Sequence, residues 1–165
     1  MIETVTHLPF PVRRIMFVCH GNICRSPMAE MVMAELLRKA GRDDVTTASA
    51  ATSTEEIGNG VHPGTVRLLT RHNIPMRRHE AVQLTRRDAE RYDLLIGMDA
   101  ANLRNMRRIL GNDAEGRIFN LLDFSDKPRD ISDPWYTGDF ETTFSDIMEG
   151  CQALLDVIRK PQIVD

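Results

Sequence analysis

The chain has 165 residues, 42% of them apolar and 27% charged, proportions typical of a globular protein. Its length fits one domain, which we place at residues 13–165 behind a short N-terminal extension at residues 1–12. The net charge of −3 gives no general attraction to nucleic acid or membranes, and no stretch is apolar enough to span a bilayer. Three cysteines, an odd number, argue against a disulfide framework. We therefore expect a cytoplasmic protein with neither a nucleic-acid nor a membrane partner.

Apolar runs alternate with helical patterns along the chain. In order, we expect a strand at 13–18, a helix at 28–40, a strand at 45–49, helices at 65–72 and 85–91, a strand at 92–98, a helix from the cap Asp99 to Leu110, a strand at 117–121 and a closing helix at 140–159. Residues 52–64 and 123–139 are expected to be loops. The alternation predicts an α/β fold with a flavodoxin-like, doubly wound sheet of four parallel strands and helices on both faces.

The segment that separates the first strand from the first helix is Cys19-His20-Gly21-Asn22-Ile23-Cys24-Arg25-Ser26. A helix N-terminus attracts anions through its free N–H groups and its dipole. Gly21 and Asn22 tolerate positive φ, which would let successive N–H groups turn inward as an anion nest. Ser26 is a good N-cap and Pro27 suits the first helical position. The segment therefore predicts a site for phosphate or another oxyanion.

A thiol and a guanidinium flank this nest. A cysteine acts as a nucleophile only as the thiolate, which a helix N-terminus and nearby cations favour. Cys19 stands at the end of the strand with both influences within reach, and Arg25 offers a planar fork to two phosphate oxygens. The pattern is typical of a nucleophile beside a bound phosphate.

Other interpretations of the loop fit less well. A structural zinc site needs four ligands, and the sequence has no second Cys/His pair at a suitable spacing. The Cys-x4-Cys spacing differs from the Cys-x-x-Cys of a thioredoxin-type site, and the loop lacks the Gly-Lys-Ser/Thr of a nucleotide P-loop. A purely structural loop stays an alternative, although it would leave the anion nest without a use.

The motif Cys-x5-Arg-Ser-Pro at residues 19–27, with Gly-Asn inside it and an apolar strand before it, resembles the signature of the low-molecular-weight protein tyrosine phosphatases. Three further segments agree with this resemblance. Asp133-Pro134-Trp135-Tyr136 resembles the family's general-acid loop, residues 49–53 its Ser-Ala-rich segment, and residues 73–84 its central Ile-Pro…His-x-Ala-x-Gln-Leu stretch. The resemblance covers the chain from about Arg14 to the last helix.

The resemblance implies a phosphatase domain that hydrolyses phosphotyrosine through a phosphocysteine intermediate, with no cofactor and no metal. It implies Cys19 as the nucleophile, Arg25 as the phosphate ligand, and Asp133 as the acid and then the base. The implied substrate-binding residues are His20, Gly21, Asn22, Ile23, Cys24 and Ser26 in the loop and Trp135 and Tyr136 at the pocket mouth. Ser26 is also expected to hydrogen-bond the thiolate, and Ser49 and His79 are expected to support the loop, His79 by pairing with a loop serine. The implied partner is a phosphotyrosine-containing protein, a tyrosine kinase being one candidate.

Other positions bear on regulation and specificity. Because both cysteines match, the resemblance implies that Cys24 forms a reversible disulfide with Cys19. Tyr136 is a candidate site of regulatory phosphorylation. His20 replaces a commoner apolar residue and is expected to affect the reactivity of the nucleophile. Glu55 stands where many relatives carry an aromatic residue at the pocket wall, so the peptide preference stays open.

The alternative enzyme of the same fold is an arsenate reductase, which resembles the phosphatases in its loop but relays a disulfide through further cysteines. After Cys24 only Cys151 remains, in the closing helix, where we expect a buried apolar residue. A catalytically silent phosphotyrosine-binding module would not need Cys19, Arg25 and Asp133 together. A flavin carrier would have a Ser/Thr/Gly-rich phosphate loop. Phosphatase chemistry is therefore the favoured hypothesis.

Overall fold

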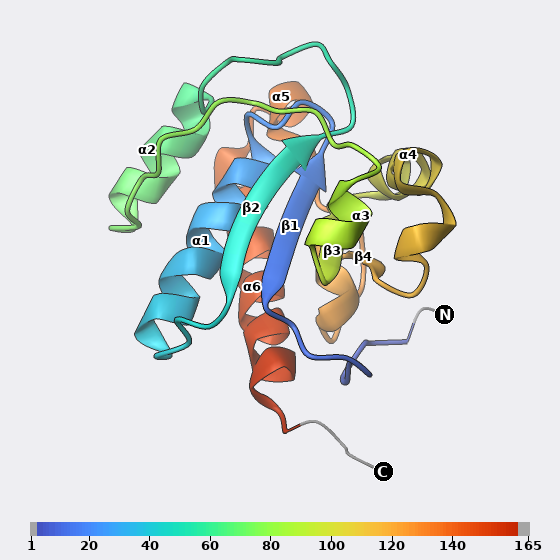
Figure 1. Cartoon of the computed structure of the whole chain (residues 1–165). Coiled ribbons are helices and arrows are strands. Elements are labelled where there is room, and N and C mark those ends of the chain that lie inside the picture. The colour runs from blue at the N-terminus through green and yellow to red at the C-terminus, as the bar shows by residue number, and fades with distance from the viewer. Residues whose placement is uncertain (1–2, 162–165) are drawn as a thin grey trace.

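The computed structural model of the chain describes residues 3–161. Four strands form one sheet in the order β2-β1-β3-β4, and each pair of neighbours is parallel. The strands are β1 Arg14–Cys19, β2 Thr46–Ala51, β3 Leu94–Gly97 and β4 Ile118–Asn120. This is the four-stranded, doubly wound parallel sheet that the sequence predicts, and Figure 1 shows β1 between its neighbours.

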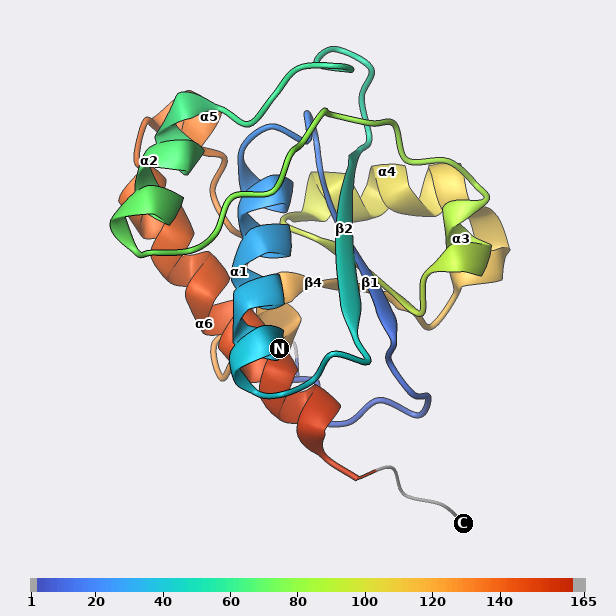
Figure 2. The same cartoon turned by 60° about the vertical axis from the view of Figure 1, so that its left-hand side comes forward.

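Helices cover both faces of the sheet, as expected (Figures 1 and 2). One face carries α1 Arg25–Lys39, α2 Pro63–Arg71 and the long α6 Phe140–Arg159, which the short α5 Pro134–Thr137 precedes. The other face carries α3 Asp88–Arg91 and α4 Ala100–Leu110. Two 3-10 turns, η1 Gly111–Ala114 and η2 Leu121–Phe124, follow α4 and β4.

The side chains of β1 explain why both faces are covered. The five residues from Ile15 to Cys19 are all buried, so neither side of this strand meets water. Because side chains alternate along a strand, Phe17 packs into the larger hydrophobic cluster with α1 and α6, while Met16 and Val18 pack into a second cluster with α4. The central strand therefore holds the loop that follows it rigidly between two cores.

Some element bounds differ from the sequence expectations. β1 and β2 run to Cys19 and Ala51, later than expected, because their parallel pairing continues to those residues. α1 begins at Arg25 rather than at residue 28. The helix expected at 85–91 is only the short α3, because the Asp88 carboxylate accepts hydrogen bonds from the Thr85 backbone and hydroxyl and makes a turn there. The loop expected at 123–139 contains α5, which the sequence analysis missed.

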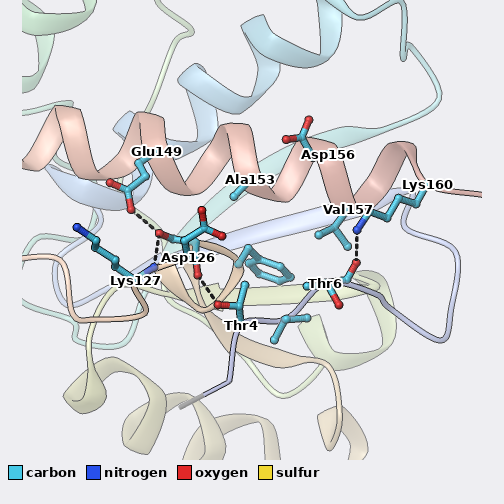
Figure 3. Close-up of a pocket in the computed structure, with 12 residues that line it drawn as sticks. Thr4, Thr6, Asp126, Lys127, Glu149, Ala153, Asp156, Val157 and Lys160 are labelled. Atoms are coloured by element: carbon cyan, nitrogen blue, oxygen red, sulfur yellow. Dashed lines mark hydrogen bonds between the residues drawn. The ribbon is translucent and has the colours of Figure 1, made fainter. Parts of the chain in front are cut away.

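Residues 3–12, the described part of the N-terminal extension, form no helix or strand but pack against the larger cluster through Val5, Leu8 and Phe10. It borders a groove of about 530 Å³ along the C-terminal half of α6, which Figure 3 shows. Lys160 reaches across this groove, and its Nζ donates to the Thr6 carbonyl at 3.0 Å. No cysteine or histidine among the described residues lines it. Within residues 3–161 no helix is long and apolar enough to cross a membrane.

Candidate active site

Residues 20–24 join β1 to α1 at the carboxyl end of the sheet, where the strand order changes direction (Figure 1). The carbonyl groups of this loop are held by surrounding segments, since they accept hydrogen bonds from Ser53 N, His79 Nε2, His62 N and Thr65 Oγ1. Within residues 3–161, no protein group accepts a hydrogen bond from the backbone N–H groups of residues 20–24. The loop is therefore a nest of unpaired donors, an arrangement suited to an anion.

Asn22 fixes the shape of the nest. Its φ of 59° lies in the left-handed region, as expected, and Asn tolerates that region better than most residues. The side chain is 0% exposed, and each of its polar atoms is used. Nδ2 donates to Ser26 Oγ at 2.8 Å and to Ser49 Oγ at 2.9 Å, while Oδ1 accepts from Val82 N at 3.1 Å. One side chain thus ties the loop to α1, β2 and the segment after α2.

The expectation of positive φ is wrong for Gly21, since the left-handed turn falls on Asn22 alone. Gly21 matters instead because it lacks a side chain. A Cβ atom there would lie 3.3 Å from Glu56 Cγ. The glycine therefore allows Glu56 to lie directly against the loop.

The Cys19 sulfur has two hydrogen-bond partners on α1. Ser26 Oγ lies 3.0 Å from Cys19 Sγ, and Ser26 N donates to the same sulfur at 3.4 Å. Because Asn22 Nδ2 already donates to Ser26 Oγ, the serine hydroxyl proton is free to point at the sulfur. The expected contact between Ser26 and Cys19 is confirmed. The expected N-cap role is wrong, since Cys24 precedes α1 and no side chain caps the helix.

Arg25 lies beneath the pocket and is 2% exposed. Its Nη1 donates to Asp99 Oδ2 at 2.7 Å and to the Ile131 carbonyl at 2.9 Å, and its Nη2 donates to Asp133 Oδ2 at 3.3 Å. Burial opposes the charge, but the Cys19 sulfur and the two carboxylates outweigh burial and raise the pKa of Arg25 above its ordinary value. Nε is buried and has no acceptor among the described residues. The Nε–Nη2 edge of the fork therefore remains for an incoming anion.

Asp133 enters the site from the start of α5. Its Oδ1 accepts a hydrogen bond from Trp135 N at 3.0 Å and so caps the helix, and Pro134 occupies a favoured first position. The Trp135 ring is 57% exposed and meets the His62 ring edge to face, with centroids 5.8 Å apart. His62 also stacks on Phe140 at 5.0 Å. These contacts fix both the carboxylate and the indole over the loop.

A pocket of about 80 Å³ opens above the loop. Its lining comes from three segments: Cys19, His20, Gly21, Ile23 and Cys24; Glu55 and Glu56; and Asp133, Trp135 and Tyr136. The structure therefore brings the expected nucleophile, the expected acid and both aromatic residues together. Asn22 and Ser26, which were expected to bind substrate, are buried behind the pocket and do not line it.

The residues expected to support the loop do so, but not all in the expected way. Ser49 Oγ accepts from Asn22 and donates to Glu30 Oε1 at 2.6 Å. Arg77 Nη1 pairs with Glu30 Oε2 at 3.0 Å. His79 pairs with the Asn22 carbonyl at 2.7 Å and not with a serine, so that expectation is wrong. The imidazole instead holds the turn by a hydrogen bond to its backbone.

The two other cysteines differ from Cys19 in their surroundings. Burial, and then the negative charges of Cys19 and Asp133, raise the pKa of Cys24 to about 12. Burial alone raises the pKa of Cys151, which is 0% exposed in α6 as expected. All three sulfurs are free thiols in this structure. In the part of the chain that the structure describes, no group of His, Cys, Asp and Glu is placed to hold a metal ion.

Several residues that hold the site were not predicted from the sequence. Asp99 was expected only as a helix cap, yet one of its oxygens caps α4 through Asn102 N and the other holds Arg25. Its place directly after β3 was the available signal, because the carboxyl ends of parallel strands meet at one edge. Glu30 and Arg77 carried no such signal, since they lie mid-helix and in a loop.

Comparison with known proteins agrees with this geometry. The model of the family "Low molecular weight phosphotyrosine protein phosphatase" matches residues 14–163. PtpA of Staphylococcus aureus (strain MRSA252), a low molecular weight protein-tyrosine-phosphatase, is 35% identical over 147 residues, which are 88% of this chain and 94% of the relative. A parallel sheet with a cysteine and an arginine beside an anion nest fits a phosphatase of this family. The chain belongs to the low molecular weight phosphotyrosine protein phosphatase family.

Solved structures agree with this assignment. YfkJ from Bacillus subtilis has a TM-score of 0.86 and 37% identity, with 91% of this chain and 96% of that one covered. SP-PTP, a low molecular weight protein tyrosine phosphatase from Streptococcus pyogenes, has a TM-score of 0.81 and 35% identity, with 90% and 94% covered. The family match does not favour the arsenate reductase alternative.

Proposed function

We propose that this phosphatase hydrolyses phosphotyrosine on proteins in two steps, through a phosphocysteine on Cys19. One observation carries the proposal: a loop of unpaired N–H donors, the Cys19 sulfur and the Asp133 carboxylate line one pocket, and the buried Arg25 beneath it contacts Asp133 and keeps Nε without an acceptor among the described residues. Each of these groups has a distinct task in phosphoryl transfer.

In the first step, the Cys19 thiolate attacks phosphorus as the bond from phosphorus to the tyrosine oxygen breaks. The Asp133 carboxyl gives its proton to that leaving oxygen, so tyrosine departs neutral. In the second step, the Asp133 carboxylate takes a proton from a water molecule, whose oxygen attacks phosphorus. The sulfur–phosphorus bond breaks, the thiolate returns, and inorganic phosphate leaves.

Arg25 and the nest hold the three equatorial phosphate oxygens while their charge redistributes. The carboxylate of Asp99 and the Ile131 carbonyl bind Nη1, so the guanidinium cannot swing away when phosphate leaves. Donors that are already in place cost no reorganisation during the reaction. Ser26 assists by its hydrogen bond to Cys19, which stabilises the thiolate before attack and again when the sulfur becomes the leaving group.

The lining of the pocket supports an aromatic phosphate ester. Ile23 is apolar, and Trp135 and Tyr136 present large exposed rings, 57% and 80% exposed. Such rings pack against the face of a phosphotyrosine, whose length places its phosphate at the floor. A phosphoserine side chain is shorter and offers no ring to these residues. We infer phosphotyrosine-containing proteins as the substrates, and autophosphorylated tyrosine kinases as one kind among them.

The proposal is tested with p-nitrophenyl phosphate and a phosphotyrosine peptide, without metal, at mildly acidic pH. Cys19→Ser should abolish turnover, and Asp133→Ala should lower kcat by about 100- to 10,000-fold, the usual contribution of a general acid. Arg25→Lys keeps the charge but loses the fork and should lower kcat/KM by about 100-fold or more. Cys151→Ala, remote from the pocket, is the matched cysteine control. Mass spectrometry of rapidly quenched enzyme should find one phosphate on Cys19, and turnover that survives Cys19→Ser would refute the mechanism.

A further inference from the structure

The mouth of the pocket carries a marked imbalance of charge. Of the described residues that line it, Glu55, Glu56 and Asp133 bear carboxylates, and none is a lysine or an arginine. Among these lining residues, the one side chain that can become a cation is His20. The cation Arg25 is 2% exposed and is already paired with two aspartates, so it acts on the phosphate and not on the residues around the phosphotyrosine.

The two glutamates are held at the rim by different contacts. Glu56 lies against the loop, with its Cγ 3.3 Å from the place where a Gly21 Cβ would be. Asn59 Nδ2 donates to Glu56 Oε2 at 2.6 Å and orients that carboxylate. Glu55 Oε2 lies 3.1 Å from His20 Nε2, while its side chain stays 71% exposed. One carboxylate is thus fixed close to the nucleophile loop, and the other extends into solvent beside it.

Resting on the function proposed above, we propose that Glu55 and Glu56 select phosphotyrosines flanked by lysine or arginine. A phosphotyrosine inserted to the loop brings the residues next to it in the peptide to this rim. Basic neighbours then meet two carboxylates, and acidic neighbours meet like charge. Electrostatic complementarity of this kind acts on encounter and on specificity more than on the chemical step.

The expected size of this preference follows from the solvent exposure of the ion pairs between the two glutamates and the peptide. A solvent-exposed ion pair contributes little free energy by itself. A peptide with basic neighbours is attracted by both carboxylates, whereas a peptide with acidic neighbours is repelled by both, and these small free energies add up. We therefore expect kcat/KM to differ by about ten-fold between the two peptides. Because the rim is exposed, salt should reduce the preference strongly between ionic strengths of about 20 mM and about 500 mM. kcat at saturating peptide should change much less than kcat/KM.

The experiment compares three phosphotyrosine peptides of equal length, with Arg, Gln or Glu on both sides of the phosphotyrosine. The wild type at low salt should prefer the Arg peptide over the Glu peptide by about ten-fold in kcat/KM, with the Gln peptide between them. Glu55→Gln should reduce this ratio, and the double variant Glu55→Gln/Glu56→Gln should bring it to about two or below. The ratio is measured within each variant, so a variant that is partly unfolded still reports it. Glu115→Gln makes the same charge change away from the pocket and should leave the ratio unaltered.

The results distinguish a failure of the proposed selectivity from a failure of the proposed function. Equal hydrolysis of the three peptides by the wild type at low salt would overturn the proposal, as would a ratio that persists in the double variant. A preference that survives at high salt would also overturn it, since exposed charges could not be its source. Failure of the wild type on every phosphotyrosine peptide and on p-nitrophenyl phosphate would instead refute the proposed function.

Discussion

Replacing Asn22 should weaken both the fold and the chemistry, by amounts that the structure allows us to estimate. In Asn22→Ala three buried hydrogen bonds are lost, at about 1 kcal/mol each. Alanine must also adopt the left-handed φ of 59°, at about 1 kcal/mol or more. We expect a loss of about 4 kcal/mol in the free energy of unfolding, a large part of the roughly 5–15 kcal/mol of a typical domain.

Asn22→Gly separates the backbone from the side chain. Glycine loses the same three hydrogen bonds but adopts the left-handed conformation without strain, at an entropic cost that offsets part of this gain. We expect the glycine variant to be more stable than the alanine variant by about 0.5–1 kcal/mol. Urea unfolding followed by circular dichroism measures both values.

The replacement of Asn22 should also change the catalytic activity. Without Asn22, the Ser26 hydroxyl is free to rotate away from the Cys19 sulfur, so kcat should fall by about 10- to 100-fold, as for a lost hydrogen bond to a charged group. Ser26→Ala should lower kcat similarly with a much smaller loss of stability. An alanine variant at least as stable as the glycine variant, or wild-type kcat in folded Asn22→Gly, would refute this account of the turn.

Three further predictions concern the cysteines, the closing helix and the pocket mouth. Since burial raises the pKa of Cys24 to about 12, only about 1 in 10,000 of its thiols is ionised at pH 8. Iodoacetamide at that pH should label Cys19 and spare Cys24, and the labelling of Cys24 should rise with pH. Peptide mass mapping measures both, and equal labelling of the two cysteines at pH 8 would contradict this. Gly150→Ala places a Cβ 2.5 Å from Leu121 Cγ. The overpacking costs about 1–3 kcal/mol and should exceed the gain in helix propensity of about 1 kcal/mol. Urea unfolding should therefore show a lower free energy of unfolding than that of the wild type, and a higher value would contradict this. Phenylphosphonate should shift the emission of Trp135, the only tryptophan, to shorter wavelength because a bound ring covers it, and inorganic phosphate should not.

Elements with a long, regular pattern were predicted accurately. The closing helix was expected at 140–159 and occurs there, with Phe144, Ile147, Cys151 and Leu154 buried, because a helical repeat of apolar residues over twenty positions leaves no other regular structure. The short α5 was missed for the opposite reason. Four residues show no period, and only the cap Asp133 followed by Pro134 marked the place where a turn of helix begins.

The expectation about Ser26 shows how a functional contact overrides a local rule. A serine before proline at a strand–helix junction is a good N-cap by its chemistry alone. The structure uses that hydroxyl on the Cys19 sulfur and leaves the first turn of α1 without a side-chain cap. In the first turn of α1, Ser26 N–H donates to the Cys19 sulfur and Met28 N–H to the Cys24 carbonyl, while Arg25 N–H has no acceptor among the described residues. The Arg25 N–H therefore remains for an anion beside the loop.

The partners of Arg25 lay beyond local sequence reasoning for a geometric reason. Asp99 lies 74 positions from Arg25, and Ile131 contributes only a backbone carbonyl, which any residue would offer. Asp99 reaches Arg25 because β3 places the start of α4 next to the end of β1, and Ile131 is held beside them because its N–H donates to the Met98 carbonyl at 2.8 Å. The groups expected to do the chemistry come from the end of β1, the start of α1 and the residue that caps α5, whereas Glu55 and Glu56 come from the segment after β2. Charge at the rim can therefore change without altering the nest, which is why we locate substrate preference there and the reaction in the loop.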